Sequence, residues 1–107
     1  MTDIKKEIIL DLSECMKVLQ KEKPDLLDKF GVKEIAIFGS YSRKEENKSS
    51  DIDILVDIKK ERKTFDNFME LKFYLSSLFP EYKIDLLIKG AIRKELRTKI
   101  LTEAVYA

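Results

Sequence analysis

Hydrophobic residues near the start of the chain recur every three or four positions, as on one face of a helix. They are Ile4, Ile8, Ile9, Leu12, Met16 and Leu19. This spacing predicts an amphipathic helix from residue 3 to about residue 21. Pro24 suits the first turn of a second, short helix, and Gly31 suits its end. We therefore expect two helices before the first strand.

Three short apolar runs, rich in β-branched residues, predict three strands over residues 32–38, 51–58 and 82–88. Gly39 stops the first run, and Gly90 stops the third.

Two further helices follow from the pattern. The first covers residues 64–79, where Thr64 can cap the start and Pro80 follows the end. The second covers residues 92–104. The order of elements predicts an α+β (α/β) fold, with a small mixed three-stranded sheet and helices packed on one face. A chain of 107 residues is expected to form a single domain over residues 1–107.

The second predicted strand alternates between aliphatic and acidic side chains. One face carries Ile52, Ile54, Val56 and Ile58, and the other carries Asp51, Asp53, Leu55 and Asp57. The wholly aliphatic face must meet the helices, so Asp51 and Asp53 lie on the open face, roughly 6.5–7 Å apart at the backbone. The third strand repeats this pattern with Asp85, which joins the other two aspartates if the strands are neighbours.

Three neighbouring carboxylates repel one another, and a divalent cation removes that conflict. Hard oxygen ligands favour Mg²⁺, with Mn²⁺ as a second choice, over zinc. Two such ions, about 3.5–4 Å apart, are a common device for phosphoryl or nucleotidyl transfer. We therefore assign Asp51, Asp53 and Asp85 as candidate catalytic residues and metal ligands.

Gly39 and Ser40 form the other half of the candidate site. Glycine lets the backbone approach a ligand closely, and free N–H groups at the start of a turn or helix bind anions. Arg43 adds a positive charge three residues later. The stretch therefore predicts a phosphate-binding turn beside a metal cluster.

The amino-acid composition excludes several other classes of function. The chain has no histidine and one cysteine, Cys15, so a histidine general base, a Cys–His nucleophile pair and a histidine-ligated zinc site are excluded. The net charge of +1 gives no basic field, so we expect no direct nucleic-acid binding. No run approaches the roughly 18 apolar residues of a membrane span. We expect a soluble, cytoplasmic protein without a membrane partner.

The motif Gly-Ser, ten residues, Asp-x-Asp in "GSYSRKEENKSSDID", with a third acidic residue in "KIDLLI", resembles the minimal nucleotidyltransferases of the DNA polymerase β superfamily. Arg43 and Ser50 also stand where that family has an arginine and a serine. Lys44 departs from the pattern, because the family usually has glycine after the arginine.

The resemblance implies a set of roles. Gly39 and Ser40, with Arg43 and Ser50, would bind the nucleotide triphosphate, and Asp51 and Asp53 would hold two Mg²⁺ ions. Asp85 would bind one ion and help deprotonate the acceptor hydroxyl. A chain of this size resembles the antitoxin of HEPN/MNT toxin–antitoxin pairs. Its expected substrate is ATP, and its expected partner is a helical HEPN-type RNase toxin that it neutralises by binding and by adenylylation.

Other interpretations stay open at this point. The chain could be an antitoxin that masks its partner without catalysis. It could also be a phosphohydrolase, but such an enzyme needs an aspartyl nucleophile in a loop after a strand, whereas Asp51 and Asp53 begin one. Arg43 could form a surface salt bridge, and Ser50 could be a local backbone cap. The many apolar residues of 64–79 could all cover the sheet, or some could form an exposed partner surface.

Overall fold

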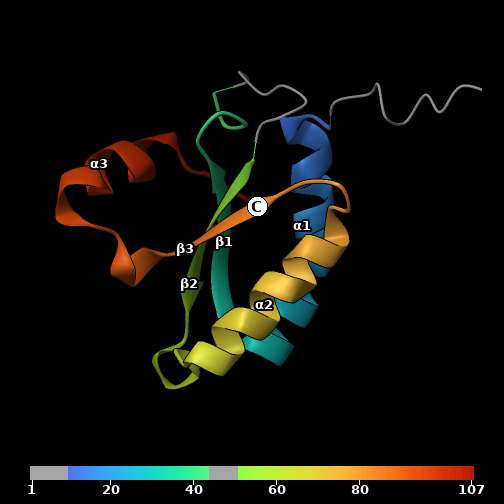
Figure 1. Ribbon diagram of the computed structural model, residues 1–107, viewed down its shortest axis with the longest axis vertical. Helices are drawn as coiled ribbons and strands as arrows, with labels where there is room; N and C mark the ends of the chain where they lie inside the picture. Colours follow the sequence, from blue (N-terminus) through green and yellow to red (C-terminus); the bar gives the residue numbers. More distant parts are fainter. Residues whose placement is uncertain (1–9, 44–50) are drawn as a thin grey trace, which may run out of the picture.

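The computed structural model describes residues 10–43 and 51–107 (Figure 1). The elements in chain order are α1 (Leu12–Phe30), β1 (Val32–Phe38), β2 (Ile52–Ile58), the 3-10 turn η2 (Lys60–Arg62), α2 (Phe65–Leu78), β3 (Ile84–Ile88), the 3-10 turn η3 (Lys89–Ala91), α3 (Lys94–Glu103) and β4 (Val105–Tyr106). The mixed α+β class is therefore confirmed. None of the helices in these two ranges is both long enough and apolar enough to cross a bilayer.

The prediction of two helices before the first strand is wrong. One continuous helix, α1, starts after its N-cap Asp11, runs through Pro24 and ends at Gly31, which takes a left-handed conformation with φ of 70°. Proline lacks the N–H that would bond to the carbonyl one turn earlier, and this weakens a helix interior. The helix continues because Leu19, Leu26 and Phe30 keep one buried face on both sides of the proline. The predicted helical residues 3–9 lie outside the described residues.

Within residues 10–43 and 51–107 the sheet has four strands, one more than the three that the pattern predicted. Its order is β3-β2-β1-β4, with β2 parallel to β3 and the other two pairs antiparallel. The additional strand β4 pairs with β1 through Ala36 and Ile37. The main strands stand where they were predicted, although β2 begins at Ile52 and β3 at Ile84.

Helices α1 and α2 cover one face of the sheet, and α3 lies on the opposite side (Figure 1). The α1/α2 side holds the main core, which includes Ile52, Ile54, Val56 and Ile58 from β2. The α3 side holds a smaller cluster of Ala36, Leu55, Ile92 and Ile100. The expectation that all helices pack on one face is therefore wrong, because Leu55 and Ala36 give the second face an apolar patch that α3 covers.

Helix α2 has the cap predicted from the sequence and one buried polar side chain that was not predicted. The hydroxyl of Thr64 accepts a hydrogen bond from the backbone N–H of Asn67 at 3.1 Å. The side-chain amide of Asn67, 7% exposed, donates to the carbonyls of Phe30 and Arg62, each at 2.9 Å. Asn67 thus ties the start of α2 to the end of α1.

Candidate active site

The parallel pairing of β2 with β3 places two of the predicted aspartates side by side. Asp53 stands directly opposite Asp85 in the register of the two strands. Asp51 precedes the first residue of β2 and is half-buried, whereas Asp85 is exposed. Side chains alternate along a strand, so Asp51 and Asp53 share the face of Leu55, which packs under α3. The aspartates therefore gather at the end of the α3 face that the helix leaves uncovered.

The environment of Asp53 disfavours its negative charge. Burial is the largest cause, followed by the charge of Asp85, a hydrogen bond that protonated Asp53 donates to Asp85, and the charge of Asp51. Together they raise the pKa of Asp53 from 3.8 to about 6, although the positive charge of Arg43 acts in the opposite direction. An opposing positive charge at this position would remove the conflict among the carboxylates.

Gly39 lies directly against the carboxylate of Asp53. A Cβ atom added to Gly39 would stand 2.1 Å from Oδ2 of Asp53, far inside contact distance, and the φ of Gly39 is +74°. Side chains other than glycine rarely adopt this backbone conformation. Both the conformation and the close approach therefore require glycine here. Phe38, the residue before it, pairs with Asp53 in the antiparallel register of β1 and β2, and that pairing produces the approach.

The turn after β1 is held by one buried side chain and by hydrogen bonds to the carbonyl of Gly39. The side chain of Tyr41 is fully buried in the core that α1 and α2 cover. The hydroxyl of Ser42 donates to the carbonyl of Gly39 at 2.8 Å, and the backbone N–H of Arg43 donates to the same carbonyl at 3.2 Å. Ser40 is half-buried and lies between Gly39 and the buried Tyr41. Sequence reasoning missed the anchoring role of Tyr41, although a lone aromatic residue in a polar turn was an available signal.

Arg43 reaches from this turn to the last residue of α3. Its Nη1 atom donates to Oε1 of Glu103 at 2.9 Å. The charge of Arg43 also lowers the pKa of Asp53, so Arg43 acts electrostatically on that carboxylate while it contacts Glu103. The salt-bridge reading of Arg43 therefore describes this structure, and Glu103 is a neighbour of the site that the sequence did not reveal. Ser50, assigned from the motif, and Lys44, which departs from the motif, lie outside the described residues.

The side chains present suit a hard divalent cation. In the parts of the chain that the structure describes, no group of three acidic, histidine or cysteine side chains already has the geometry of a metal centre. The Asp53–Asp85 pair nevertheless offers oxygen donors from adjacent strands. The pKa of Asp53 is raised first by burial and then by the neighbouring carboxylates, and a bound cation would offset both effects. The donor set therefore fits Mg²⁺ or Mn²⁺, and it contains neither nitrogen nor sulfur ligands.

Comparison with known proteins gives consistent results. Residues 19–107 match the nucleotidyltransferase domain family. A candidate protein adenylyltransferase of Methanocaldococcus jannaschii is 47% identical over 92 residues, which cover 86% of this chain and 92% of that protein. The protein adenylyltransferase MntA of Thermococcus cleftensis is 39% identical over 98 residues, which cover 92% of this chain and 97% of that protein.

Solved structures show the same fold. A candidate minimal nucleotidyltransferase superposes with a TM-score of 0.73 at 28% identity, over 89% of this chain and 94% of that one. A complex of a tri-AMPylated Shewanella oneidensis HEPN toxin with its MNT antitoxin matches with a TM-score of 0.54 at 23% identity, over 89% of this chain and 66% of that one. The chain therefore belongs to the nucleotidyltransferase domain family and has the fold of the minimal nucleotidyltransferases.

Proposed function

We propose that this enzyme transfers AMP from ATP to a hydroxyl group of a partner protein, a HEPN-type RNase toxin, and so neutralises that toxin. The family membership supports nucleotidyl transfer. The name of the T. cleftensis relative supports a protein as acceptor, and the AMPylated toxin in the S. oneidensis complex supports both AMP and the class of partner. A reaction that consumes ATP is expected to take place in the cytoplasm.

One observation carries the proposal: the phosphate-binding turn and the aspartates are in direct contact. Gly39 is so close to the carboxylate of Asp53 that no side chain fits between them. Asp53 in turn lies beside Asp85 on the neighbouring strand β3. A nucleotide whose phosphates lay on the turn would therefore have its reacting phosphorus beside the carboxylates.

Nucleotidyltransferases depend on divalent metal ions, and we propose two Mg²⁺ ions, which would neutralise developing charge on the phosphates when bound. Asp51, Asp53 and Asp85 would hold them, and Gly39, Ser40 and Arg43 would hold the phosphates, with Ser50 proposed from the motif alone.

The bond changes follow from this arrangement. The acceptor oxygen forms a bond to the α-phosphorus of ATP, and the bond from that phosphorus to the bridging oxygen of the β-phosphate breaks, so pyrophosphate leaves. The acceptor proton passes to Asp85, which is exposed and so can be reached by a partner protein.

The test is transfer of label from α-labelled ATP to a purified HEPN-type partner in the presence of Mg²⁺. We expect Asp53→Asn to abolish labelling while the protein remains folded. Asp57→Asn is the matched control, because Asp57 lies on the same strand and face but forms an ion pair with Lys33 at 3.5 Å. It should label the partner as the unmodified chain does. Full labelling by Asp53→Asn would refute the mechanism.

A masking antitoxin is the second candidate, and exposed aromatic side chains favour it. Phe65 is 77% exposed and Phe73 is 70% exposed, both on α2. Exposed apolar side chains of this size are typical of contact surfaces. We would test it with a triple variant in which Asp51, Asp53 and Asp85 are all replaced by asparagine. Neutralisation of the partner's RNase activity by that variant would favour masking over catalysis.

A further inference from the structure

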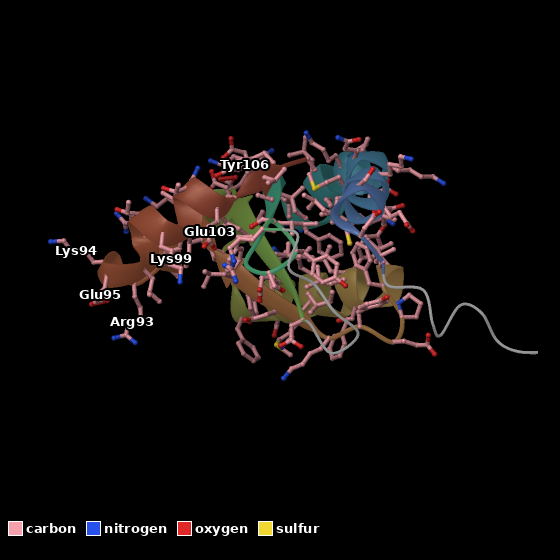
Figure 2. All side chains as sticks on the ribbon, turned by 90° about the horizontal axis from the view of Figure 1, so that it is seen from above. Arg93, Lys94, Glu95, Lys99, Glu103 and Tyr106 are labelled. Atoms are coloured by element: carbon pink, nitrogen blue, oxygen red, sulfur yellow. The ribbon has the colours of Figure 1, made fainter. Side chains whose placement is uncertain are left out.

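Glu103 differs from the charged residues that precede it on α3. Lys94, Glu95 and Lys99 are exposed, whereas the side chain of Glu103 is only 18% exposed. Figure 2 shows Arg93, Lys94 and Glu95 at the far end of α3 and Glu103 beside the body of the molecule. The carboxylate of Glu103 accepts the 2.9 Å hydrogen bond from Arg43 described above. A half-buried charge with a defined partner requires a structural explanation, whereas a solvated charge does not.

The backbone of Glu103 is fixed on both sides by contacts to the strand that leads into the site. Before it, Ile100 packs in the cluster that contains Ala36 of β1. After it, β4 pairs with Ala36 and Ile37 of the same strand, and the N–H of Ala107 donates to the carbonyl of Ile35 at 2.9 Å. Because β1 continues directly into Gly39, these contacts fix the position of Glu103 relative to the phosphate-binding turn.

Arg43 needs such a partner. Its side chain is long and 41% exposed at the end of a turn, and an arginine in that situation loses much rotamer freedom when it binds a ligand. A carboxylate at a fixed position restricts the guanidinium before the ligand arrives. Preorganisation of this kind improves binding by lowering the entropy cost. The charge of Arg43 lowers the pKa of Asp53, which supports a guanidinium held near that carboxylate.

We propose that Glu103 is a positioning residue of the nucleotide site, which holds the Arg43 guanidinium ready for the phosphates of the bound nucleotide. The role rests on the proposed function, because it assumes a nucleotide at the Gly39 turn. Glu103 does not touch the nucleotide itself. Its contribution passes through Arg43, so its removal should weaken nucleotide binding more than it slows the chemical step.

The first test is Glu103→Gln, which keeps the shape of the side chain and removes its charge. We expect the KM for ATP to rise about 5- to 10-fold with kcat changed less than about 2-fold, as for a lost binding interaction. The matched control is Glu95→Gln on the same helix. Glu95 also pairs with an arginine, Arg93 at 3.6 Å, but both side chains are highly exposed and lie far from the turn. This control should leave the KM unchanged.

A double-mutant cycle separates positioning from a general structural effect. Arg43→Ala alone should raise the KM for ATP at least as much as Glu103→Gln does. Adding Glu103→Gln to Arg43→Ala should then cause no further increase, because the residue that Glu103 positions is gone. Multiplicative effects of the two changes would overturn the proposal. A KM for Glu103→Gln equal to that of the unmodified chain would overturn it as well.

A titration of ATP·Mg²⁺ binding, measured beside the transfer assay, separates this inference from the proposed function. If the unmodified chain binds ATP but transfers no AMP, the proposed function fails, and the Kd values of the same variants still decide the role of Glu103. If the chain transfers AMP and Glu103→Gln behaves as the unmodified chain does, only this inference fails. An unmodified chain that binds no ATP would overturn both. Thermal unfolding of each variant confirms that it is folded.

Discussion

The two faces of the sheet meet different demands. The face under α1 and α2 is lined by aliphatic side chains and forms the larger of the two described cores. The opposite face carries a small apolar cluster under α3 and leaves its other end to the aspartates. Burial of apolar area supplies most of the stability of a domain, so the first face can hold the fold while the second accommodates mutually repelling charges. Asp53 and Ile54 are neighbours in sequence, yet they belong to these two different faces.

The largest effect on stability is expected on the aliphatic face. Ile54 belongs to β2 and is fully buried in the core under α1 and α2. Ile54→Ala should lower the free energy of unfolding by about 2–5 kcal/mol, because contacts are lost and a cavity remains. Denaturant unfolding measures this. The ATP affinity of the fraction that remains folded should be nearly unchanged. A variant with full stability would show that the α1/α2 core does not hold the sheet.

The two glycines with positive φ offer a finer comparison, since one ends a helix and the other touches Asp53. Gly31→Ala and Gly39→Ala should each cost about 1–2 kcal/mol of stability because of the strained backbone. At Gly31 the added methyl group meets Cβ and Cγ of Arg62, away from the aspartates, whereas at Gly39 it meets the carboxylate of Asp53. Only Gly39→Ala should therefore lose the rise in melting temperature that Mg²⁺ and ATP produce. Equal losses in both variants would contradict the placement of the site.

Replacement of Asp53 is expected to change the free energy of unfolding less, and to increase it. Because its pKa is raised in the folded state, ionisation of Asp53 opposes folding. Its contribution to stability is fully present below pH 3.8 and is lost as the pH rises through about 6. At pH 7 without metal, Asp53→Asn should be more stable than the unmodified chain by about 1 kcal/mol, after allowance for solvent screening.

The comparison of melting curves at pH 4 and pH 7 checks this prediction, because the two proteins should converge at the lower pH. Mg²⁺ should raise the melting temperature of the unmodified chain at pH 7 and have little effect on Asp53→Asn, since a ligand stabilises the state that binds it. A destabilised Asp53→Asn at pH 7 in the absence of metal would contradict the electrostatic account of the site.

The smallest effect on stability is expected at the exposed aromatics. Phe73→Ser should change the free energy of unfolding of the isolated chain by less than about 0.5 kcal/mol, because the side chain is largely in solvent. Phe79→Ala, at the C-cap of the same helix, removes a buried ring and should cost about 3–5 kcal/mol. If Phe73→Ser destabilised the chain as Phe79→Ala does, the ring would belong to the core and not to a contact surface.

Alternation along the strands was enough to predict where the aspartates lie. Side chains alternate between the two faces of β2 and β3, so Asp53 and Asp85 point away from the aliphatic core. The observed register places them opposite each other. The cap at Thr64 was also predictable, because the hydrogen bond that defines it is local. Local chemistry and simple periodicity are properties of the sequence itself.

Features that depend on distant contacts were not predictable from those rules. Strand β4 has only two residues and forms because the edge of β1 is available to pair with it. Helix α1 passes through Pro24 because buried residues on either side continue the same face. The ion pair of Arg43 with Glu103 joins residues 60 positions apart. Each requires knowledge of which segments meet in space.

A crystal structure of the protein with Mn²⁺ and a non-hydrolysable ATP analogue, with the metal located by anomalous scattering, tests the proposed site most directly. We expect manganese held by Asp51 and Asp53, with at least one ion also bound by Asp85, and the phosphates against the turn at Gly39 and Ser40. Manganese or phosphate bound away from these residues, with the aspartates left facing solvent, would contradict this placement.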